Sequence, residues 1–264
     1  MRASGVDRRP FGARGEIGVA KRIVDEQWSQ HLLKNQPGAR RVDDRRVISG
    51  IIHVLRTGCR WCDCPAEYGP STTIYNRFHR WSGRRFWTGL VEALAASGAV
   101  TKSMAIDSTY VKAHRSAHGG KGGPKSQAIG KSRGGQTTKV HLLTDTLGRP
   151  HTLVLTPGNA SDMTGADLLL SRMPKTRYLI ADKGYDADRL RASLRNRGTV
   201  PVIPGRTNRK RKVAYDRKRY RNRHLVENAF CRLKDFRRVA TRYDKLAANF
   251  LSAVALVAII AFWV

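Results

Sequence analysis

The sequence predicts an α/β protein in which a mixed five-stranded sheet is flanked by helices and preceded by a small all-α domain. Two observations support this prediction. Apolar residues recur with a helical period up to about residue 100 and with a strand-like period from Met104 onwards. The chain of 264 residues is also long enough for a large domain joined to a smaller one. We therefore expect regions at 1–24, 25–100 and 101–264.

The N-terminal region, residues 1–24, is basic and has no apolar period, so we expect a disordered extension. The first helix follows in the second region. Asp43 can cap it, and Gly58 can end it in a left-handed conformation. Its apolar positions keep a helical period between these residues: Val47, Ile48, Ile51, Ile52 and Leu55.

After a turn-rich stretch that ends at Pro70, a second helix is expected from Ser71 or Thr72, and a third follows it through residues 86–94. The second helix carries Arg77 and Arg80 away from its apolar face. Two helices around a turn, the second bearing arginines, are typical of a helix-turn-helix-like DNA-binding domain. A purely structural helical cap has the same pattern, so that alternative stays open.

The third region alternates strand-type and helix-type segments. They are the strand Ala105–Val111, a hairpin of 140–144 and 152–156, a helix over 162–172, the strand 178–181, a helix that Asp186 caps and that ends near Gly198, the strand 200–203 and a helix from about Tyr220. This order is that of a ribonuclease-H-like fold: three strands, then a helix, a strand, a helix, a strand and a helix. Residues 118–139 are rich in glycine, lysine and serine, which predicts a mobile basic loop.

The charge balance is extreme. The chain has 50 Lys and Arg against 20 Asp and Glu, a formal net charge of +30. Such a protein is expected to bind a polyanion, with an affinity that falls steeply as salt rises. Between Arg206 and Arg223, ten of eighteen residues are Lys or Arg. This segment is the predicted phosphate-binding surface, above all at Arg209, Lys210, Arg211 and Lys212.

Two other patterns invite functional interpretations that we do not favour. Cys59, Cys62 and Cys64 are spaced like part of a zinc site, but no fourth soft ligand follows promptly. We expect reduced thiols and a cytoplasmic, nucleoid-associated protein. The apolar segment Leu246–Val264 is long enough to span a bilayer, yet polar residues interrupt it. A buried core helix without membrane contact is the favoured interpretation.

The last predicted helix carries an unusual polar stripe. Tyr220, Arg223, Glu227 and Lys234 follow one another at offsets of three, four and seven residues, which places them on one helix face. A solvated charged face with an Arg-Glu pair would look similar. A functional interpretation of the stripe depends on two aspartates of the predicted sheet.

Asp107 lies on the first predicted strand, Asp182 ends the fourth, and Glu227 lies on the last helix. A ribonuclease-H-like fold gathers its acids at these places. Magnesium prefers oxygen ligands and keeps some of its waters, so a few carboxylates suffice for a site open to phosphate and nucleophile. Two such ions, about 4 Å apart, can stabilise the attacking and the leaving oxygen of a phosphoryl transfer.

The spacing Tyr-x2-Arg-x3-Glu-x6-Lys resembles the signature of DDE transposases of the insertion sequence four and five families. The similarity to the latter family extends from about Trp28 to the C-terminus, through the segments 56–61, 105–109, 117–120, 180–186 and 245–250. The resemblance implies that Asp107, Asp182 and Glu227 are the catalytic and metal-binding triad. It also implies magnesium or manganese as the cofactor, an N-terminal helix-turn-helix that binds terminal inverted repeats, and a multimer on paired DNA ends.

The expected activity is therefore cleavage of the element's ends followed by strand transfer into target DNA. Tyr220, Arg223 and Lys234 are expected to contact DNA beside the triad. Two alternatives stay open. The chain could be a catalytically inactive repressor that binds the inverted repeats, or a ribonuclease-H-like nuclease without strand transfer. Cys62 and Cys64 replace the Arg and aliphatic residue more usual in relatives, which indicates drift rather than a metal site.

Overall fold

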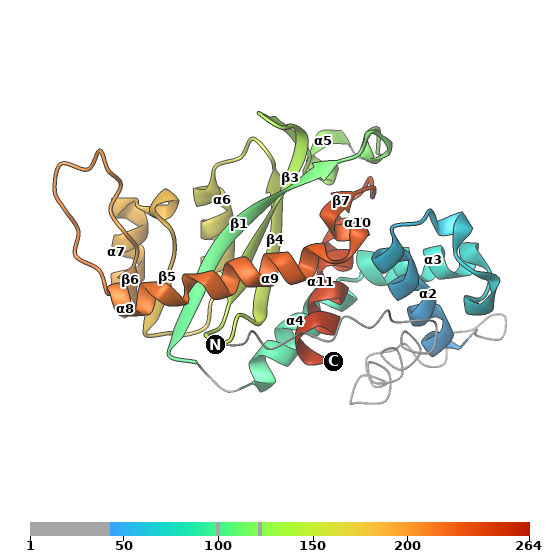
Figure 1. Ribbon diagram of the computed structural model, residues 1–264, viewed down its shortest axis with the longest axis horizontal. Coiled ribbons are helices and arrows are strands. Elements are labelled where there is room, and N and C mark those ends of the chain that lie inside the picture. Colours follow the sequence, from blue (N-terminus) through green and yellow to red (C-terminus); the bar gives the residue numbers. More distant parts are fainter. Residues whose placement is uncertain (1–42, 99–100, 121–122) are drawn as a thin grey trace, which may run out of the picture. The chain divides into compact units, whose positions relative to one another are not determined.

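The computed structural model describes residues 43–98, 101–120 and 123–264 (Figure 1). The chain divides into two compact units, with the boundary between Phe78 and His79. The predicted extension at residues 1–24 lies outside the described residues.

The first unit contains the predicted helix α2, Asp44–Thr57. Its ends are those that the sequence indicates. The Asp43 carboxylate accepts a hydrogen bond from the backbone N–H of Arg45 at 3.0 Å. Gly58 ends the helix with a φ of 76°, a left-handed conformation that costs glycine little. The apolar positions of α2 are buried, as predicted.

The connection after α2 is longer than the turn of a typical helix-turn-helix. It contains two short 3-10 turns, η2 (Trp61–Asp63) and η3 (Ala66–Tyr68), before α3 (Ser71–Gly83) begins. The helices α2 and α3 approach closely at Gly50, where an added Cβ would lie 2.8 Å from Cδ1 of Ile74. The sequence predicted the two helices, but their connection is not the tight turn of that motif.

The second unit includes a helix that the sequence grouped with the N-terminal domain. Helix α4 (Phe86–Ser97) packs against strand β4 and against the C-terminal helix α11 (Ala247–Trp263). Ten residues of α11 are buried, which confirms the predicted core helix. No helix in the described part of the chain is long and apolar enough to cross a membrane.

One seven-stranded mixed sheet forms the centre of the second unit. In space, β3 and β5 flank the central strand β1, β4 pairs with β3, and β6 pairs with β5. The five predicted strands are β1, β3, β4, β5 and β6, and their arrangement confirms the expected ribonuclease-H-like order. Two short strands, β2 and β7, were not predicted. The strands are β1 Ser103–Ala113, β2 Gly130–Ser132, β3 Gly135–Thr144, β4 Pro150–Pro157, β5 Tyr178–Ile180, β6 Val200–Val202 and β7 Thr241–Arg242.

The prediction of a mobile loop over residues 118–139 was wrong for most of its described part. This segment contains helix α5 (Gly123–Gln127), strand β2 and the first part of β3. Tertiary contacts order it. The Gln127 amide donates to the Ala117 carbonyl at 3.0 Å, and the buried Arg242 guanidinium donates to the Thr138 hydroxyl at 2.5 Å. The Arg242 anchor comes from a distant part of the chain, so local composition did not reveal it.

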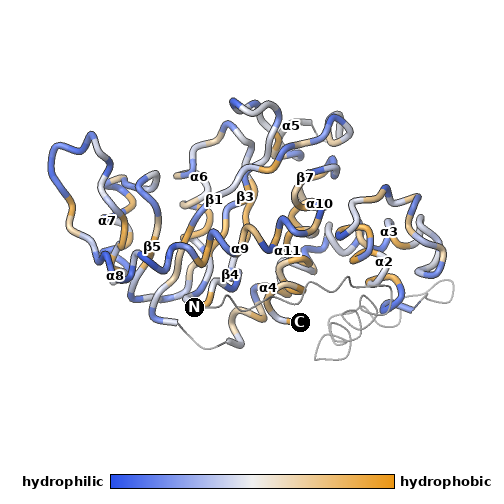
Figure 2. The backbone as a smooth tube through the Cα atoms, viewed as in Figure 1, coloured by the Kyte–Doolittle hydropathy of each residue, from blue (hydrophilic) through white to orange (hydrophobic). Residues whose placement is uncertain are grey.

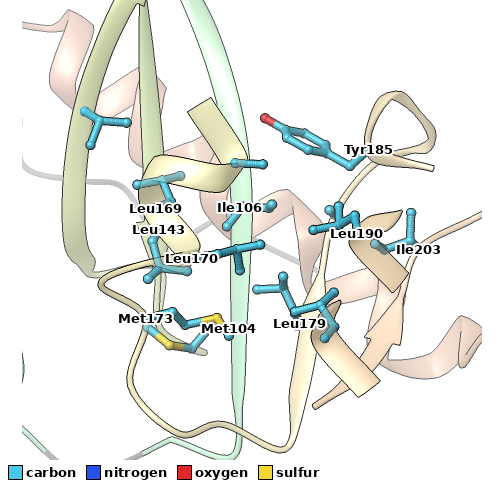
Figure 3. Close-up of a cluster of buried hydrophobic side chains, with 14 residues drawn as sticks. Met104, Ile106, Leu143, Leu169, Leu170, Met173, Leu179, Tyr185, Leu190 and Ile203 are labelled. Atoms are coloured by element: carbon cyan, nitrogen blue, oxygen red, sulfur yellow. The ribbon is translucent and has the colours of Figure 1, made fainter. Parts of the chain in front are cut away.

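The two faces of β1 face different helices. Met104 and Ile106 belong to a buried apolar cluster with residues of helices α6 (Asp162–Leu170) and α7 (Asp188–Asn196), as Figure 3 shows. Side chains alternate along a strand, so Asp107 points to the opposite face. Helix α9 (His224–Lys234) crosses that face (Figure 1). The sheet therefore separates an apolar layer from a layer that contains the polar stripe.

Asp186 does not cap helix α7, contrary to the prediction. Ala187 is the N-cap, and the buried Asp186 carboxylate instead accepts from Nε of Arg191 at 2.8 Å and Nε of Arg209 at 2.9 Å. It also accepts from the backbone N–H of Arg206 at 2.8 Å. Asp186 thus attaches the start of the basic segment to the sheet domain. Figure 2 shows the chain between β6 and α8 as largely hydrophilic.

The last predicted helix is divided into pieces. It begins as α8 (Arg217–Tyr220), tightens into the 3-10 turn η6 (Arg221–Arg223), and continues as α9. After α9 the chain bends at Phe236, which has extended backbone angles, and α10 (Arg237–Ala240) follows. The predicted last helix is therefore not continuous, and the buried side of α9 is formed by Val226, Ala229, Phe230 and Leu233.

Candidate active site

Asp107 lies on the central strand β1. It pairs with Leu142 of β3, and its carboxylate accepts a hydrogen bond from the backbone N–H of Ser108 at 2.8 Å. Only 13% of the Asp107 side chain is exposed. A carboxylate with so little water around it favours a bound cation.

Asp182 lies level with Asp107 on the neighbouring strand. β1 and β5 are parallel, and Ala105 pairs with Ile180, so each aspartate is two residues beyond that pair. Adjacent strands are about 4.8 Å apart, and residues at equal steps face the same side. The Asp182 carboxylate accepts from the backbone N–H of Gly184 at 2.9 Å. The sheet register therefore brings the two predicted aspartates together.

Glu227 reaches the same place from helix α9, and Arg223 connects it to the sheet. One guanidinium nitrogen of Arg223 lies 3.1 Å from Oδ2 of Asp107, and the other lies 2.5 Å from Oε1 of Glu227. Arg223 and Glu227 are four residues apart, a spacing that places them on one side of a helix. One guanidinium thus bridges two predicted triad carboxylates that are 120 residues apart in the chain.

The environment of Asp107 weakens its acidity. Burial raises the pKa of Asp107 to about 6, although the Ser108 N–H and the Arg223 guanidinium lower it. The carboxylates of Asp182 and Glu227 raise this pKa further, because the three acids lie within electrostatic range of one another. An acid with a strongly raised pKa beside other carboxylates is typical of a functional site.

The donor chemistry of this cluster fits a hard divalent cation, because carboxylate oxygens are the ligands that magnesium and manganese prefer. The positions of the side chains, however, do not make a closed site. No group of three Asp, Glu, His or Cys side chains in the described ranges is arranged to hold a metal ion. Arg223 occupies the space between two of the three acids. Binding of a cation would therefore require side-chain rearrangement.

The other two residues of the stripe also lie near the acids. The Lys234 ammonium donates to Oγ1 of Thr109 at 2.7 Å, and Thr109 is two residues beyond Asp107 on the same face of β1. Burial raises the pKa of the Tyr220 hydroxyl, Arg223 lowers it, and Asp182 and Glu227 raise it. The structure therefore gathers the stripe and both aspartates around one place on the sheet.

Sequence reasoning missed a polar network behind this place. Asp162 accepts hydrogen bonds from Oγ of Ser108 at 2.8 Å and from the Lys139 ammonium at 3.0 Å. Lys139 is buried, and its one carboxylate partner comes from another element. A lysine directly before the predicted strand 140–144 was the available signal. The network supports Ser108, whose N–H binds the Asp107 carboxylate.

Tyr185 is a second residue that the sequence did not single out. It is buried, and its hydroxyl has no hydrogen-bond partner in the described part of the chain. Burial raises the pKa of Tyr185, and the nearby Asp107 carboxylate raises it further. Figure 3 shows its hydroxyl at the edge of the apolar cluster.

The predicted phosphate contacts differ in their surroundings. Lys210, Arg211 and Lys212 are exposed, and the first two line an open hollow in the basic segment. Arg209 is instead held by Asp186 at 2.9 Å and also pairs with Asp188. Arg209 therefore fastens this segment to the domain.

The predicted contacts of the N-terminal helices also differ from each other. Arg77 is mostly buried and forms an ion pair with Asp44 at 2.6 Å, whereas Arg80 is exposed. A further basic hollow of about 460 Å³ is lined by Lys218, Arg219 and Arg221 together with Ser103 and Asn222. The sequence analysis included these three cations in the basic segment but did not predict that they line a hollow of their own.

Two of the three clustered cysteines, Cys62 and Cys64, lie in different surroundings. Sγ of Cys64 is buried 3.7 Å from the Gly50 carbonyl, whereas Cys62 is exposed.

Comparisons with known proteins relate both parts of the chain to transposition. Residues 100–263 match the family model described as "Transposase DDE domain", and residues 23–91 match "Putative transposase of IS4/5 family". The putative transposase of insertion sequence element IS6501 from Brucella ovis is 36% identical over 124 residues, which are 46% of this chain and 93% of that protein. The putative transposase of IS402 from Burkholderia cepacia is 31% identical over 137 residues, 48% of this chain and 63% of that protein.

A solved structure supports the fold. The piggyBac transposase in its synaptic complex with hairpin DNA aligns with 97% of this chain and 75% of its own, with a TM-score of 0.53 and 9% sequence identity. At that identity the similarity concerns the fold alone. The family match covers more than half of the chain, including all seven strands and the three acids. The chain therefore belongs to the DDE transposase family, as the spacing of its polar stripe indicated.

Proposed function

We propose that this transposase binds the terminal inverted repeats of an insertion sequence, cleaves the DNA at the element's ends and joins the freed 3′ ends to target DNA. The single observation that carries this proposal is the convergence of Asp107, Asp182 and Glu227 on one face of the sheet, within electrostatic range of one another. The proposed partners are double-stranded DNA and further copies of this chain on paired ends.

Asp107, Asp182 and Glu227 are the residues proposed to hold magnesium or manganese. When bound, the ions would supply Lewis-acid stabilisation of the charge that develops on the reacting phosphate. The chain contributes the positions of the ligands. The sheet register places Asp107 beside Asp182, and Ser108 and Gly184 orient the two carboxylates through backbone N–H donors.

Positive side chains near the acids are proposed to hold the DNA strand. The Lys234 ammonium has a fixed place beside Thr109, from which it can contact a phosphate oxygen close to Asp107. Tyr220, only partly buried, is proposed to stack on or hydrogen-bond to the strand. The exposed Lys210, Arg211, Lys212 and Arg80 are proposed contacts to more distant phosphates.

Substitution of Glu227 by Gln tests the assignment. Gln keeps the size of the side chain but removes the charge that a cation needs, so we expect end cleavage to fall by about a thousandfold or more. The measurement is the rate of metal-dependent cleavage of a labelled duplex that carries the element's end. Cleavage at the wild-type rate would refute the role of Glu227.

The matched control is Glu92→Gln, which removes the same charge at a half-exposed helix position that pairs with Arg172. Glu92 is on α4, and its substitution is expected to leave cleavage unchanged. The same reactions, run with a second unlabelled duplex, separate the alternatives. Joined products indicate strand transfer, cleavage alone indicates a nuclease, and binding without cleavage by the wild-type protein indicates a repressor.

A further inference from the structure

Arg223 is in contact with two of the acids that the proposed function assigns to a metal. Its two terminal nitrogens lie 3.1 Å from Oδ2 of Asp107 and 2.5 Å from Oε1 of Glu227. The guanidinium therefore lies between the carboxylates, where a cation shared by them would be expected. Asp182, the third acid, accepts from the N–H of Gly184, and no ion pair joins it to Arg223 in the described part of the chain.

We infer that Arg223 competes with the divalent cation for Asp107 and Glu227, so that a DNA phosphate must draw Arg223 away before the site takes up its metal with full affinity. This inference rests on the proposed function. It assigns Arg223 a second role besides the proposed contact to phosphate: Arg223 sets the order in which DNA and metal bind.

Charge explains why the two cations exclude each other. A guanidinium is permanently charged, and its planar fork binds two acceptors at once. While it pairs with Asp107 and Glu227, both carboxylates are partly neutralised, and an approaching divalent cation is repelled by the guanidinium. The pair with Asp107 is the better shielded one, since 21% of the Arg223 side chain and 13% of the Asp107 side chain are exposed.

The hydrogen bonds of Arg223 are incomplete in this position. Its Nε is buried and has no hydrogen-bond partner in the described part of the chain. A phosphate group can accept two parallel hydrogen bonds from a guanidinium, one of them from Nε. A DNA strand at the site would therefore offer Arg223 a complete set of acceptors and leave the carboxylates to the metal. Glu227, with 51% of its side chain exposed, can turn without repacking the core.

The test measures binding of Mn²⁺ alone, without DNA, by isothermal titration calorimetry or electron paramagnetic resonance. We expect Arg223→Gln to bind Mn²⁺ about tenfold or more tightly than the wild-type protein. Loss of one positive charge raises cation affinity wherever it occurs, so Arg221→Gln is the matched control. Arg221 is exposed and two residues away, and no side-chain ion pair or hydrogen bond of Arg221 occurs in the described ranges. Its effect is expected to be under about twofold.

Arg223→Lys separates charge from geometry. A lysine keeps the positive charge but cannot bridge two carboxylates with a planar fork, so an intermediate Mn²⁺ affinity is expected. Addition of a short DNA duplex is expected to raise the Mn²⁺ affinity of the wild-type protein and to have a smaller effect on Arg223→Gln. Circular dichroism melts of each variant verify that it is folded.

Two results overturn the inference. Mn²⁺ affinity of Arg223→Gln that equals or falls below that of Arg221→Gln shows that Arg223 does not compete with the metal. A DNA effect of equal size in the wild-type protein and in Arg223→Gln shows that Arg223 does not couple the two ligands.

Asp107→Asn distinguishes these failures from failure of the proposed function. If the acids hold the metal, Asp107→Asn abolishes Mn²⁺ binding whatever Arg223 does. If Asp107→Asn binds Mn²⁺ like the wild-type protein, the metal site itself is assigned wrongly, and the inference falls with it.

Discussion

At the scale of single residues, the site depends on side chains whose roles are set by one or two contacts. Lys234 is the simplest case, because within the described residues its ammonium has a single hydrogen-bond partner, the Thr109 hydroxyl at 2.7 Å. That contact holds a positive charge two residues along β1 from Asp107. Arg223, by contrast, is shared between two acids, so its removal changes several interactions at once.

Replacement of Lys234 by Met should therefore reduce catalysis without unfolding the protein. Met keeps much of the apolar stem and removes the charge, and the loss of one preorganised donor costs about a hundredfold in rate. The free energy of unfolding should change by less than about 1 kcal/mol, since the bond is to a neutral hydroxyl. End-cleavage rates and urea melts measure both quantities.

Thr109→Val is the companion variant for Lys234. Val keeps the shape of Thr109 and removes the hydroxyl, which leaves the Lys234 charge in place but less well oriented. We expect a smaller fall in the cleavage rate than for Lys234→Met. Wild-type cleavage by Lys234→Met would show that the ammonium takes no part in the reaction.

At the scale of elements, helix α6 packs closely on the sheet over a buried histidine. His141 of β3 is buried, and its Nε2 lies 2.8 Å from Oγ1 of Thr156 on β4. Gly165 of α6 lies over its ring, where a Cβ would be 2.2 Å from Nδ1. Only glycine permits this approach. Burial lowers the pKa of His141 to about 4, so the imidazole is neutral in the folded protein at neutral pH.

The protein should lose stability as the pH falls from about 6.5 to about 4. His141 has a lower pKa folded than unfolded, so the unfolded chain binds the proton first. Its contribution is complete above the unfolded pKa of 6.5 and is lost as the pH falls through the folded value of about 4. Since a tenfold change in a binding constant is about 1.4 kcal/mol, the loss from this residue is about 3 kcal/mol at most.

Thermal melts at several pH values measure this effect. His141→Gln keeps a hydrogen-bonding side chain that does not titrate, so its melting temperature should fall less between pH 6.5 and 4. His151→Gln serves as the control. Burial also lowers the pKa of His151, but this side chain is less buried than His141, so its substitution should change the pH dependence of the melting temperature less. Equal pH dependence of the wild-type protein and His141→Gln would contradict the assignment to His141.

At the scale of the whole molecule, the net charge of +30 predicts that phosphate contacts dominate DNA affinity. The structure adds that not every cation of the basic segment is free to bind a DNA phosphate, because Arg209 pairs with Asp186 and Asp188. Neutralising Lys210, Arg211 and Lys212 together should lower the slope of log affinity against log salt by about 3, since each duplex phosphate contact contributes about 0.9. Binding of a duplex measured at four or more salt concentrations gives this slope.

Arg209 should behave differently from its three neighbours. Because Asp186 and Asp188 hold it, Arg209→Gln should lower the melting temperature and change the slope little. A triple variant of exposed cations elsewhere, Arg84, Lys175 and Arg195, removes the same charge and should leave most of the slope intact. An equal loss of slope in both triple variants would show that net charge, and not this segment, sets DNA affinity.

The sequence alone was sufficient for much of the sheet and for the candidate acids. Strand-like and helical periods are local, so β1, β3, β4, β5 and β6 were predicted, as were the caps of α2 at Asp43 and Gly58. The short strands β2 and β7 were not, because they exist only through pairing with β3 and β1. Asp186 was misassigned for the same reason, since its arginine partners are brought to it by folding.

By itself, then, the sequence determined the types and order of the five main strands and their helices, the family and the members of the polar stripe. Each of these depends on local periodicity, spacing and composition. Only the tertiary structure decided which charges meet. The register of β5 against β1 places Asp182 beside Asp107, and the packing of α9 on the sheet puts Arg223 between Asp107 and Glu227. Pairings of this kind join residues that are distant in sequence, and they depend on strand register and helix orientation, which no local pattern encodes.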